Sequence, residues 1–364
     1  MKEQERSIIS MTESGLYCEA GRFWIDPSRR VARAVITHAH TDHARPGMER
    51  YLTHRDGVPL LRSRLGDGIS VEGIEYGRSI RMHDATVTLF PAGHILGSSQ
   101  VHIDVGGRQA VVTGDYKRAL DPTCTPFEVA RCDELISEAT FALPVFRWTD
   151  PAQVMSKIAS WWGDNVARGL TSVLFVYALG KAQRVLASLP SCPGPVLAHG
   201  AITKYQDAYA SAGFSLPSLI PCEADAIKAH RGQALVLAPP SAQATPWHRK
   251  LGPTSTGFAS GWMRIRGRKR HRGVDEGFVL SDHADWGELQ ETIKESGAER
   301  VRMMHGYTDV ISRWLSEQGL DAAPLVGSEA VSRDDDPALS EPSSSETLTL
   351  WDLPQSDRPG GGGA

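Results

Sequence analysis

The sequence predicts an α/β fold of two domains, one of them inserted into the other. Three observations carry this prediction. Between residues 148 and 255, apolar strands alternate with amphipathic helices, as in a parallel α/β unit. On both sides of that region, short β-branched strands end in histidine, aspartate and glycine. The chain has 364 residues, which is long enough for more than one hydrophobic core.

Composition and charge limit the class of protein. No apolar run approaches the roughly 18–20 residues that span a bilayer, and the charged first six residues lack the apolar core of a signal peptide. The five cysteines include no C-x-x-C pair, so we expect reduced thiols, a cytoplasmic location and no thiolate metal site. The net charge of −4 includes an acidic tail after Val326, and the rest of the chain is nearly neutral.

The first 140 residues read as short strands. We expect a strand pair over residues 16–27, a strand over residues 31–36 and two strands around His83. Further strands are predicted over residues 101–105, 109–113 and 135–138. Asp26 falls at the end of the first pair, where an aspartate before proline is also common in turns.

The stretch after the strand at residues 31–36 carries the densest chemistry in the chain. His38, His40, Asp42 and His43 lie within six positions on one predicted loop. Imidazole and carboxylate side chains together suit a borderline divalent metal such as zinc or manganese. The spacing H-x-H-x-D-H is far more specific than a single histidine pair.

Three later strand ends add single polar side chains. His94 lies between two glycines, which let the backbone turn tightly. Asp115 follows a strand in the order Thr-Gly-Asp, and Glu138 ends another apolar strand. Each of these positions would be weak on its own, and Glu138 alone reads as a surface glutamate.

The middle of the chain alternates helices and strands. Asp150-Pro151 is a good helix start, and the helix should run to about Gly169 with its tryptophans in the core. Strands are expected over residues 172–179, 195–198 and 234–238, with helices over residues 180–189 and 202–212. After this region, His283 and His305 again follow predicted strands over residues 277–280 and 300–304, with helices over residues 286–296 and up to 318.

These motifs, in this order, resemble those of the β-CASP branch of the metallo-β-lactamase nucleases. The resemblance covers about residues 15–320, and within the branch it is greatest to the bacterial ligase-associated DNA damage response exonucleases. It implies a metallo-β-lactamase αββα sandwich with an inserted β-CASP-type α/β domain. The expected boundaries are 1–147 for the first part of the sandwich, 148–255 for the insertion, 256–326 for the returning part and 327–364 for a disordered acidic tail.

The resemblance also implies a site for two divalent ions, zinc or manganese. One ion would be held by His38, His40 and His94, the other by Asp42, His43 and His305, with Asp115 as the bridge. Asp42, Asp115, Glu138 and His283 would be the catalytic residues, with His283 as general acid oriented by Glu138. Asp26 and Thr140 would support these residues from behind.

Substrate phosphates would need cationic partners. Lys181 follows a glycine at a predicted helix start, which is a natural anion site. The run Arg264–Arg272 is the dense basic segment of the chain, and a basic run is otherwise an ordinary solvated face. We expect nucleic-acid contacts from Arg264, Arg266, Arg268, Lys269, Arg270 and Arg272, without base-specific readout.

The resemblance therefore implies a metal-dependent DNA exonuclease that acts in repair, on DNA rather than RNA and preferably on single strands. A DNA ligase and a helicase are the partners that such a pathway would supply, and no membrane partner is expected. The alternative is an RNA nuclease of the same branch, like RNase J or the messenger-RNA 3′-end processing factors. A small-molecule hydrolase and a metal-free scaffold subunit remain as further alternatives, which bound metal and nuclease assays would separate.

Overall fold

The computed structural model describes residues 7–190 and 192–326. These residues divide into two compact units. Unit 1 comprises residues 7–143, 207–215 and 282–326, and unit 2 comprises residues 144–206 and 216–281. One unit is therefore inserted into the other, as the sequence predicts.

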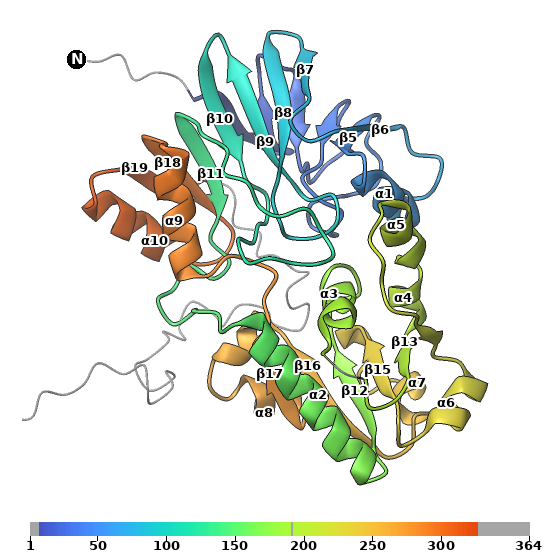
Figure 1. Cartoon of the computed structure of the whole chain (residues 1–364). Coiled ribbons are helices and arrows are strands. Elements are labelled where there is room, and N and C mark those ends of the chain that lie inside the picture. Colours follow the sequence, from blue (N-terminus) through green and yellow to red (C-terminus); the bar gives the residue numbers. More distant parts are fainter. Residues whose placement is uncertain (1–6, 191, 327–364) are drawn as a thin grey trace, which may run out of the picture. The chain divides into compact units, whose positions relative to one another are not determined.

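Unit 1 contains two β-sheets (Figure 1). The first sheet has its strands in sequence order: β1 (Ile9–Thr12), β2 (Gly15–Cys18), β3 (Phe23–Ile25), β4 (Ala34–Val35), β5 (Tyr51–His54) and β6 (Val71–Ile74). The second sheet has the order β19 (Asp321–Pro324), β18 (Arg300–Met304), β11 (Glu134–Glu138), β10 (Arg108–Val112), β9 (Ser99–Val105), β8 (Ala85–Pro91) and β7 (Ser79–Met82).

The core of unit 1 lies on both faces of the second sheet. On one face, Val87, Val101 and Ile103 belong to the same apolar cluster as Phe23 and Ile25 of the first sheet. On the other face, residues of β11 and β18 pack against α9 (Trp286–Ser296) and α10 (Thr308–Glu317). With α1 (Gly57–Leu65) against β5 and β6, this confirms the predicted αββα fold.

Three neighbouring strands of the second sheet position polar residues at one edge. β11 pairs in parallel with both β10 and β18, and Glu138 lies opposite Met304. Because the carboxyl ends of parallel strands meet at the same sheet edge, the segments after these strands come together there. Asp115, Glu138 and His305 therefore converge although they are far apart in the sequence.

Unit 2 is built on a parallel sheet of order β14 (Ile220–Pro221), β13 (Val196–Ala198), β15 (Leu235–Ala238), β12 (Thr171–Phe175), β16 (Thr254–Ala259) and β17 (Glu276–Phe278). Both faces are buried, which explains the continuous apolar runs of β12 and β15. Its helical elements are α2 (Pro151–Ala167), α3 (Lys181–Ser188), α4 (Gly200–Thr203), α6 (Ala224–His230), α7 (Pro246–Arg249) and α8 (Arg268–Arg272), and the 3-10 helices are η1 (Pro240–Ala242) and η2 (Gly261–Arg264).

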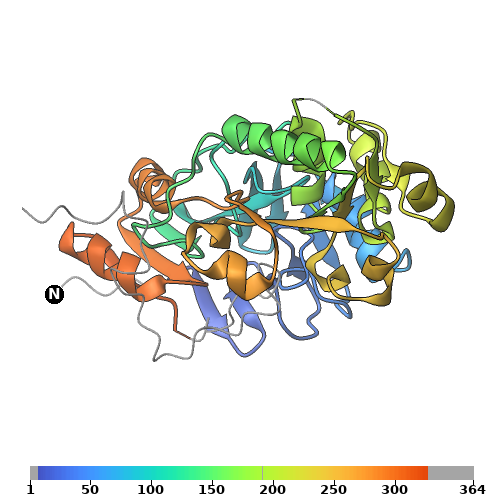
Figure 2. The same ribbon diagram turned by 90° about the horizontal axis from the view of Figure 1, so that it is seen from below.

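The longest helix, α2, begins as the sequence predicts. Asp150 accepts a hydrogen bond from the Ala152 amide at 2.9 Å, and Pro151 occupies the first turn. Val154, Ile158 and Trp162 form its buried face, so the prediction that Trp162 belongs to the core is confirmed. Figures 1 and 2 both show α2 lying along the unit 2 sheet.

Several sequence-based boundaries are wrong. The insertion does not end at residue 255, because β16 and β17 pair within the unit 2 sheet and the chain returns to unit 1 only at Asp282. The predicted helix over residues 202–212 is split into α4 and α5 (Gln206–Ser211), and residues 207–215 belong to unit 1. Helix α1 was not predicted. The predicted disordered tail, residues 327–364, lies outside the described residues.

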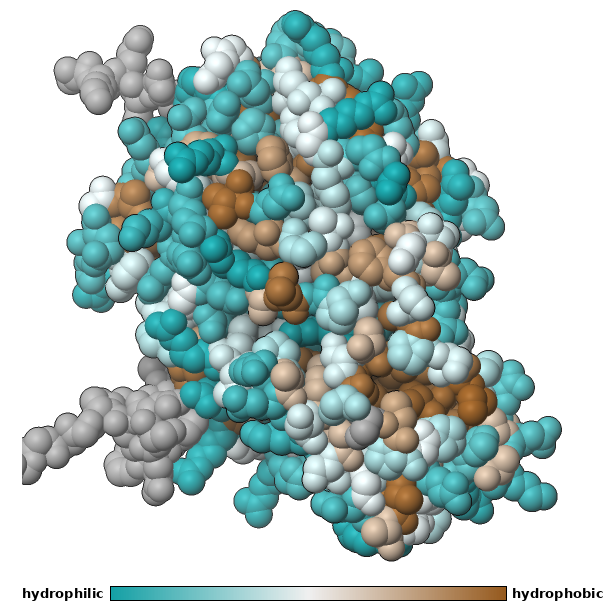
Figure 3. Space-filling model, viewed as in Figure 1, coloured by the Kyte–Doolittle hydropathy of each residue, from teal (hydrophilic) through white to brown (hydrophobic). Residues whose placement is uncertain are grey.

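Hydrophilic side chains cover much of the face in Figure 3, with hydrophobic ones in separate areas. Among the described residues, the large apolar side chains that stand exposed are Leu120, Val310 and Val326. No helix in the described part of the chain has both the length and the apolar character needed to cross a bilayer.

Candidate metal centre

The histidine loop begins directly after β4. Ile36 still donates a backbone hydrogen bond to Leu52 of β5, and the Thr37 amide donates to Asp26 Oδ1 at 2.8 Å. The loop is thus fixed on both sides at the point where the ligand-type side chains begin. His38 and His43 are buried, and His40 is half-buried.

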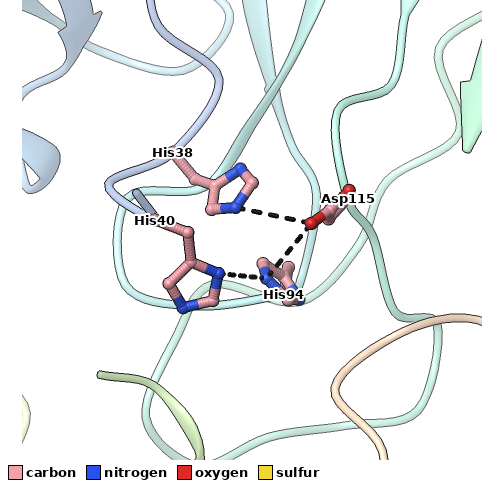
Figure 4. Close-up of side chains that lie close together, drawn as sticks. All are labelled: His38, His40, His94 and Asp115. Carbon is pink, nitrogen blue, oxygen red and sulfur yellow. Dashed lines mark hydrogen bonds and ion pairs between the residues drawn. The ribbon is translucent and has the colours of Figure 1, made fainter. Parts of the chain in front are cut away.

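Four side chains converge from three loops, one of which is this histidine loop (Figure 4). His38, His40, His94 and Asp115 each offer one donor atom, and these atoms all lie within 4.8 Å of one another. Asp115 Oδ2 lies 3.5 Å from His38 Nε2 and 3.9 Å from His94 Nε2. His40 faces the group with Nδ1, which lies 3.1 Å from His94 Nε2. We call these four residues the His/Asp cluster.

A second group adjoins the cluster through Asp115. His43 Nε2 lies 3.4 Å from Asp115 Oδ2 and 3.7 Å from Asp42 Oδ2. The rings of His43 and His305 have centroids 5.7 Å apart. All the residues predicted as metal ligands are therefore brought together in unit 1, with Asp115 between the two groups.

Buried polar atoms of these residues lack hydrogen-bond partners within the described chain. They are His38 Nε2, His43 Nε2, one oxygen of Asp115 and both oxygens of Asp42. Burying such atoms unsatisfied is costly, so their convergence indicates positions where a cation supplies the missing interaction. The donor set of imidazoles and carboxylates fits divalent zinc or manganese.

The pKa shifts of the histidines in and beside the His/Asp cluster also favour a bound cation. Burial lowers the pKa of His43, but the carboxylates of Asp115, Asp42 and Asp26 outweigh it and hold that pKa well above its usual range. For His38, burial and the neighbouring His43 instead lower the pKa well below its usual range. The carboxylates thus create a site that attracts positive charge, and divalent ions would take the place of protons there.

Asp26 supports the loop from behind. Its Oδ2 accepts a hydrogen bond from His43 Nδ1 at 2.7 Å, and its carboxylate also binds the Thr37 amide and hydroxyl. This fixes the His43 ring so that Nε2 points toward Asp115. Asp26 has φ of +44°, a left-handed conformation that is rare for a non-glycine residue. A carboxylate in this position would orient His43 toward a metal ion, as outer carboxylates do for ligating histidines.

The loop that carries His94 is held equally tightly. His94 Nδ1 lies 2.7 Å from the backbone oxygen of Asp282, which fixes the proton on Nδ1 and leaves Nε2 for the cluster. Gly93 has φ of +70°, and a Cβ atom there would come within 2.4 Å of the Lys117 carbonyl oxygen. A side chain at this position would therefore push apart the loops that carry His94 and Asp115.

Glu138 and His283 form a buried pair beside the cluster. Glu138 Oε2 lies 2.9 Å from His283 Nδ1, and Glu138 Oε1 accepts the Tyr116 amide at 2.7 Å. Burial raises the pKa of Glu138, while His283 opposes that rise. Donor atoms of Asp115, Glu138 and His283 also lie within 4.8 Å of one another. Thr140 is buried two residues beyond Glu138.

The predicted phosphate contacts lie in unit 2, with mixed exposure. Lys181 is only 1% exposed, and its Nζ lies 4.4 Å from the centre of the Tyr177 ring. This burial leaves little of the side chain open to a phosphate, and the role of Lys181 stays a prediction. Arg272 packs over the Phe258 ring, and Arg268 lies over Trp262. Arg266, Lys269 and Arg270 are exposed, and Arg264 is half-buried.

Sequence reasoning did not find two of the supports. The contact from the Asp282 carbonyl cannot be recognised in the sequence, because every residue has a backbone carbonyl group. The buried ion pair of Lys117 with Asp121, 2.6 Å long, follows the Thr-Gly-Asp motif, and Asp121 also accepts from the Thr123 amide. The i, i+4 spacing of opposite charges just after a ligand motif could have indicated it.

The chain is similar to several known proteins. It is 31% identical over 315 residues to a probable DNA ligase of Opitutus terrae, a match that covers 85% of this chain and 30% of that protein. It is 24% identical to an RNase J-like protein of Methanocaldococcus jannaschii over 48% of this chain and 47% of that one. An Endoribonuclease YSH1 of Gibberella zeae is 32% identical over 39% of this chain and 17% of its own length.

This chain thus spans less than half the length of these relatives. No family model matches it. A solved structure of a protein of unknown function from Enterococcus faecalis V583 aligns with a TM-score of 0.54 and 14% identity, covering 75% of each chain, which supports the fold alone. In its fold, its ordered motifs and its similarity to these relatives, the chain resembles the β-CASP branch of the metallo-β-lactamase superfamily.

Proposed function

We propose that the protein is a metal-dependent nuclease, and specifically a DNA exonuclease that acts in repair. The observation that carries the proposal is the convergence of the His/Asp cluster with Asp42, His43 and His305 beside the Glu138–His283 pair. A cation site next to an oriented imidazole is what hydrolysis of a phosphodiester needs.

We assign His38, His40 and His94 to one divalent ion, Asp42, His43 and His305 to a second, and Asp115 to both. Zinc and manganese fit these donors. Two such ions would polarise the scissile phosphate and activate water at neutral pH. Asp26 holds the His43 ring in place, and the Asp282 carbonyl does the same for His94.

A side chain of the protein would supply the proton that the leaving group needs. Glu138 accepts from His283 Nδ1, and the other ring nitrogen, Nε2, would donate a proton to the departing sugar oxygen. The Tyr116 amide holds Glu138 from the opposite side, which keeps the carboxylate aimed at His283. In this proposal His283 is the general acid, and Glu138 positions it, with Thr140 behind.

DNA is the favoured substrate because the relative that covers most of this chain is named a probable DNA ligase. A repair role alongside ligase and helicase activities, in the cytoplasm, is proposed on the same basis. RNA is the second candidate, because the other relatives are named RNase J-like or Endoribonuclease YSH1. The exposed residues Arg266, Lys269 and Arg270 would contact the sugar–phosphate backbone of either polymer.

The test is digestion of end-labelled single-stranded DNA and matched RNA with zinc, manganese or magnesium. The control is the Asp42→Ala/His43→Ala double variant. Progressive shortening of DNA from one end, lost in the control, is the expected result and gives the polarity. Cutting of RNA alone would move the protein to RNA processing. If metal is bound and neither polymer is cut, the nuclease proposal is wrong.

A further inference from the structure

Unit 2 contains a pocket that shares no residue with the metal centre. Its volume is about 170 Å³, and it is formed by the start of α2, the segment that precedes it, η2 and β17. Helix α2 contacts β17, and Figure 1 shows the two elements next to each other. The pocket, here called the Arg147 pocket, is lined by Arg147, Thr149, Val154, Lys157, Arg264, Gly277, Phe278 and Val279.

The charged side chains among the described lining residues of the Arg147 pocket are all positive. Three of these lining residues are cations, and none is acidic. Arg147 and Lys157 are exposed and pair with no acidic side chain in the described part of the chain. The nearby acids are engaged elsewhere: Asp150 caps α2, and Glu276 pairs with Lys269 at 3.2 Å. Arg147 and Lys157, together with the Arg264 guanidinium in the same lining, favour an anionic ligand.

One of the three cations is fixed in place. Arg264 Nε donates a hydrogen bond to the Val145 carbonyl oxygen at 3.1 Å, and the side chain is half-buried. The guanidinium group therefore has less freedom to lose when a ligand binds. A planar fork held at a pocket wall is suited to the paired oxygens of a phosphate.

Apart from Thr149 and Gly277, the rest of the pocket lining is apolar. Val154 and Phe278 are buried and Val279 is half-buried, and the Phe278 ring meets the Trp161 ring edge-on at 5.5 Å. A small inorganic anion would leave this surface uncovered. An anion with a flat or apolar body would cover it, and a nucleotide combines a phosphate with such a body.

The segment that follows Arg264 carries further positively charged side chains. Arg264 begins the segment that runs through Arg266 to α8, where Lys269 and Arg270 are exposed. A polyanion with regularly spaced phosphates could thus contact the pocket and this segment together, whereas a free nucleotide could use only the pocket.

We propose that the Arg147 pocket holds one nucleotide of a single-stranded nucleic acid, with its phosphate between Arg147, Lys157 and Arg264 and its sugar or base against Val154 and Phe278. The identity of this ligand rests on the proposed nuclease function. The pocket acts in binding and contributes no group to the reaction.

The experiment measures binding of fluorescein-labelled oligothymidylate to the full chain, with chelator present so that no cutting occurs. The variant is Arg147→Ala/Lys157→Ala. The matched control is Arg168→Ala/Lys228→Ala, which removes two exposed unit 2 cations that do not line the pocket. We expect the pocket variant to bind about tenfold more weakly, with a flatter dependence of affinity on salt by about 0.7 per lost phosphate contact, and the control to change less than about twofold.

The charge-preserving variant Arg147→Lys/Lys157→Arg should keep most of the affinity, which separates lost charge from a damaged fold. Equal binding by the pocket and control variants would overturn the assignment. Competition by dTMP as strong as that by the oligonucleotide would also overturn it, in favour of a free nucleotide. If binding depends on the pocket but the chain cuts nothing when metal is restored, the nuclease proposal is wrong and the binding role of the pocket stands. If the wild-type chain does not bind the oligonucleotide, both proposals are wrong.

Discussion

At the scale of single residues, the geometry of the candidate metal centre depends on the residues that hold its side chains in place as much as on those side chains themselves. Asp26 accepts hydrogen bonds from His43 Nδ1 at 2.7 Å and from the Thr37 amide at 2.8 Å. One carboxylate therefore fixes both the orientation of the His43 ring and the start of the histidine loop. The strained backbone of Asp26 and the positive φ of His305 show that the surrounding structure over-determines these positions.

The variant Asp26→Asn should lower metal content and nuclease activity by about 10- to 100-fold, because the amide keeps the size of the side chain and loses its charge toward His43. Metal analysis of the purified protein together with the digestion assay measures this. Asp67→Asn, on an exposed loop, is the control. Unchanged metal and activity in Asp26→Asn would show that Asp26 is only a turn aspartate.

His54 makes stability depend on pH. Its ring is buried and stacks on Tyr76 with centroids 3.6 Å apart, and burial lowers its pKa to about 4. The unfolded chain protonates this histidine near its usual pKa of about 6.5. Its contribution is therefore complete above about pH 6.5 and is lost as the pH falls toward about 4.

Urea unfolding of chelated protein between pH 4.5 and 7.5 tests this. The variant His54→Gln should show a smaller loss of stability on acidification than the wild type. His271→Gln, at an exposed position, should follow the wild type. Parallel curves for the wild type and His54→Gln would contradict the assignment.

At the scale of elements, the parallel run β10–β11–β18 is what assembles the site. The strands end at the same sheet edge, and each passes directly into a segment that carries a site residue. The turn after β18 is tight, since Gly306 has φ of +66° and a Cβ atom there would lie 2.4 Å from the Ala139 carbonyl oxygen.

We expect Gly306→Ala to lower the free energy of unfolding by about 1–3 kcal/mol and to reduce metal binding, because the clash displaces the strand end that carries His305. Gly297→Ala is a matched control: its φ is also positive, at +72°, but a Cβ atom there meets nothing within 4 Å. Chemical unfolding of both variants gives the comparison. An equal cost of about 1 kcal/mol in each would mean that only the backbone conformation matters.

At the scale of the whole molecule, the candidate metal centre is a concentration of carboxylates and imidazoles that divalent cations would stabilise. These side chains come from segments between residues 26 and 305 and are buried or half-buried, and several of their polar atoms lack hydrogen-bond partners in the described chain. Metal binding should therefore stabilise unit 1 as a whole.

Removal of metal with a chelator should lower the melting temperature, and zinc or manganese should restore it. At free metal 100 times above the Kd, one site stabilises by about 2.7 kcal/mol. Differential scanning fluorimetry with and without metal measures the shift. The Asp42→Ala/His43→Ala variant should respond less. A wild-type melting temperature that is indifferent to metal would contradict the two-ion assignment.

The sequence by itself determined the alternation of elements and the local motif. Strand β18 and helix α9 have the predicted bounds, and the predicted α2 start and αββα fold are confirmed, because each depends on local pattern and capping. The loop from His38 to His43 was also identifiable, because its side chains are neighbours in the chain.

Only the tertiary structure decided the features that depend on contacts between segments far apart in the sequence. Strand pairing placed β16 and β17 in unit 2 and moved the boundary from residue 255 to Ser281, since a short strand does not encode its partner. It also buried Lys181, which the sequence predicts as a phosphate contact at a helix start. The Asp282 carbonyl and the Arg147 pocket were invisible for the same reason: each is made by groups that meet only when remote segments pack together.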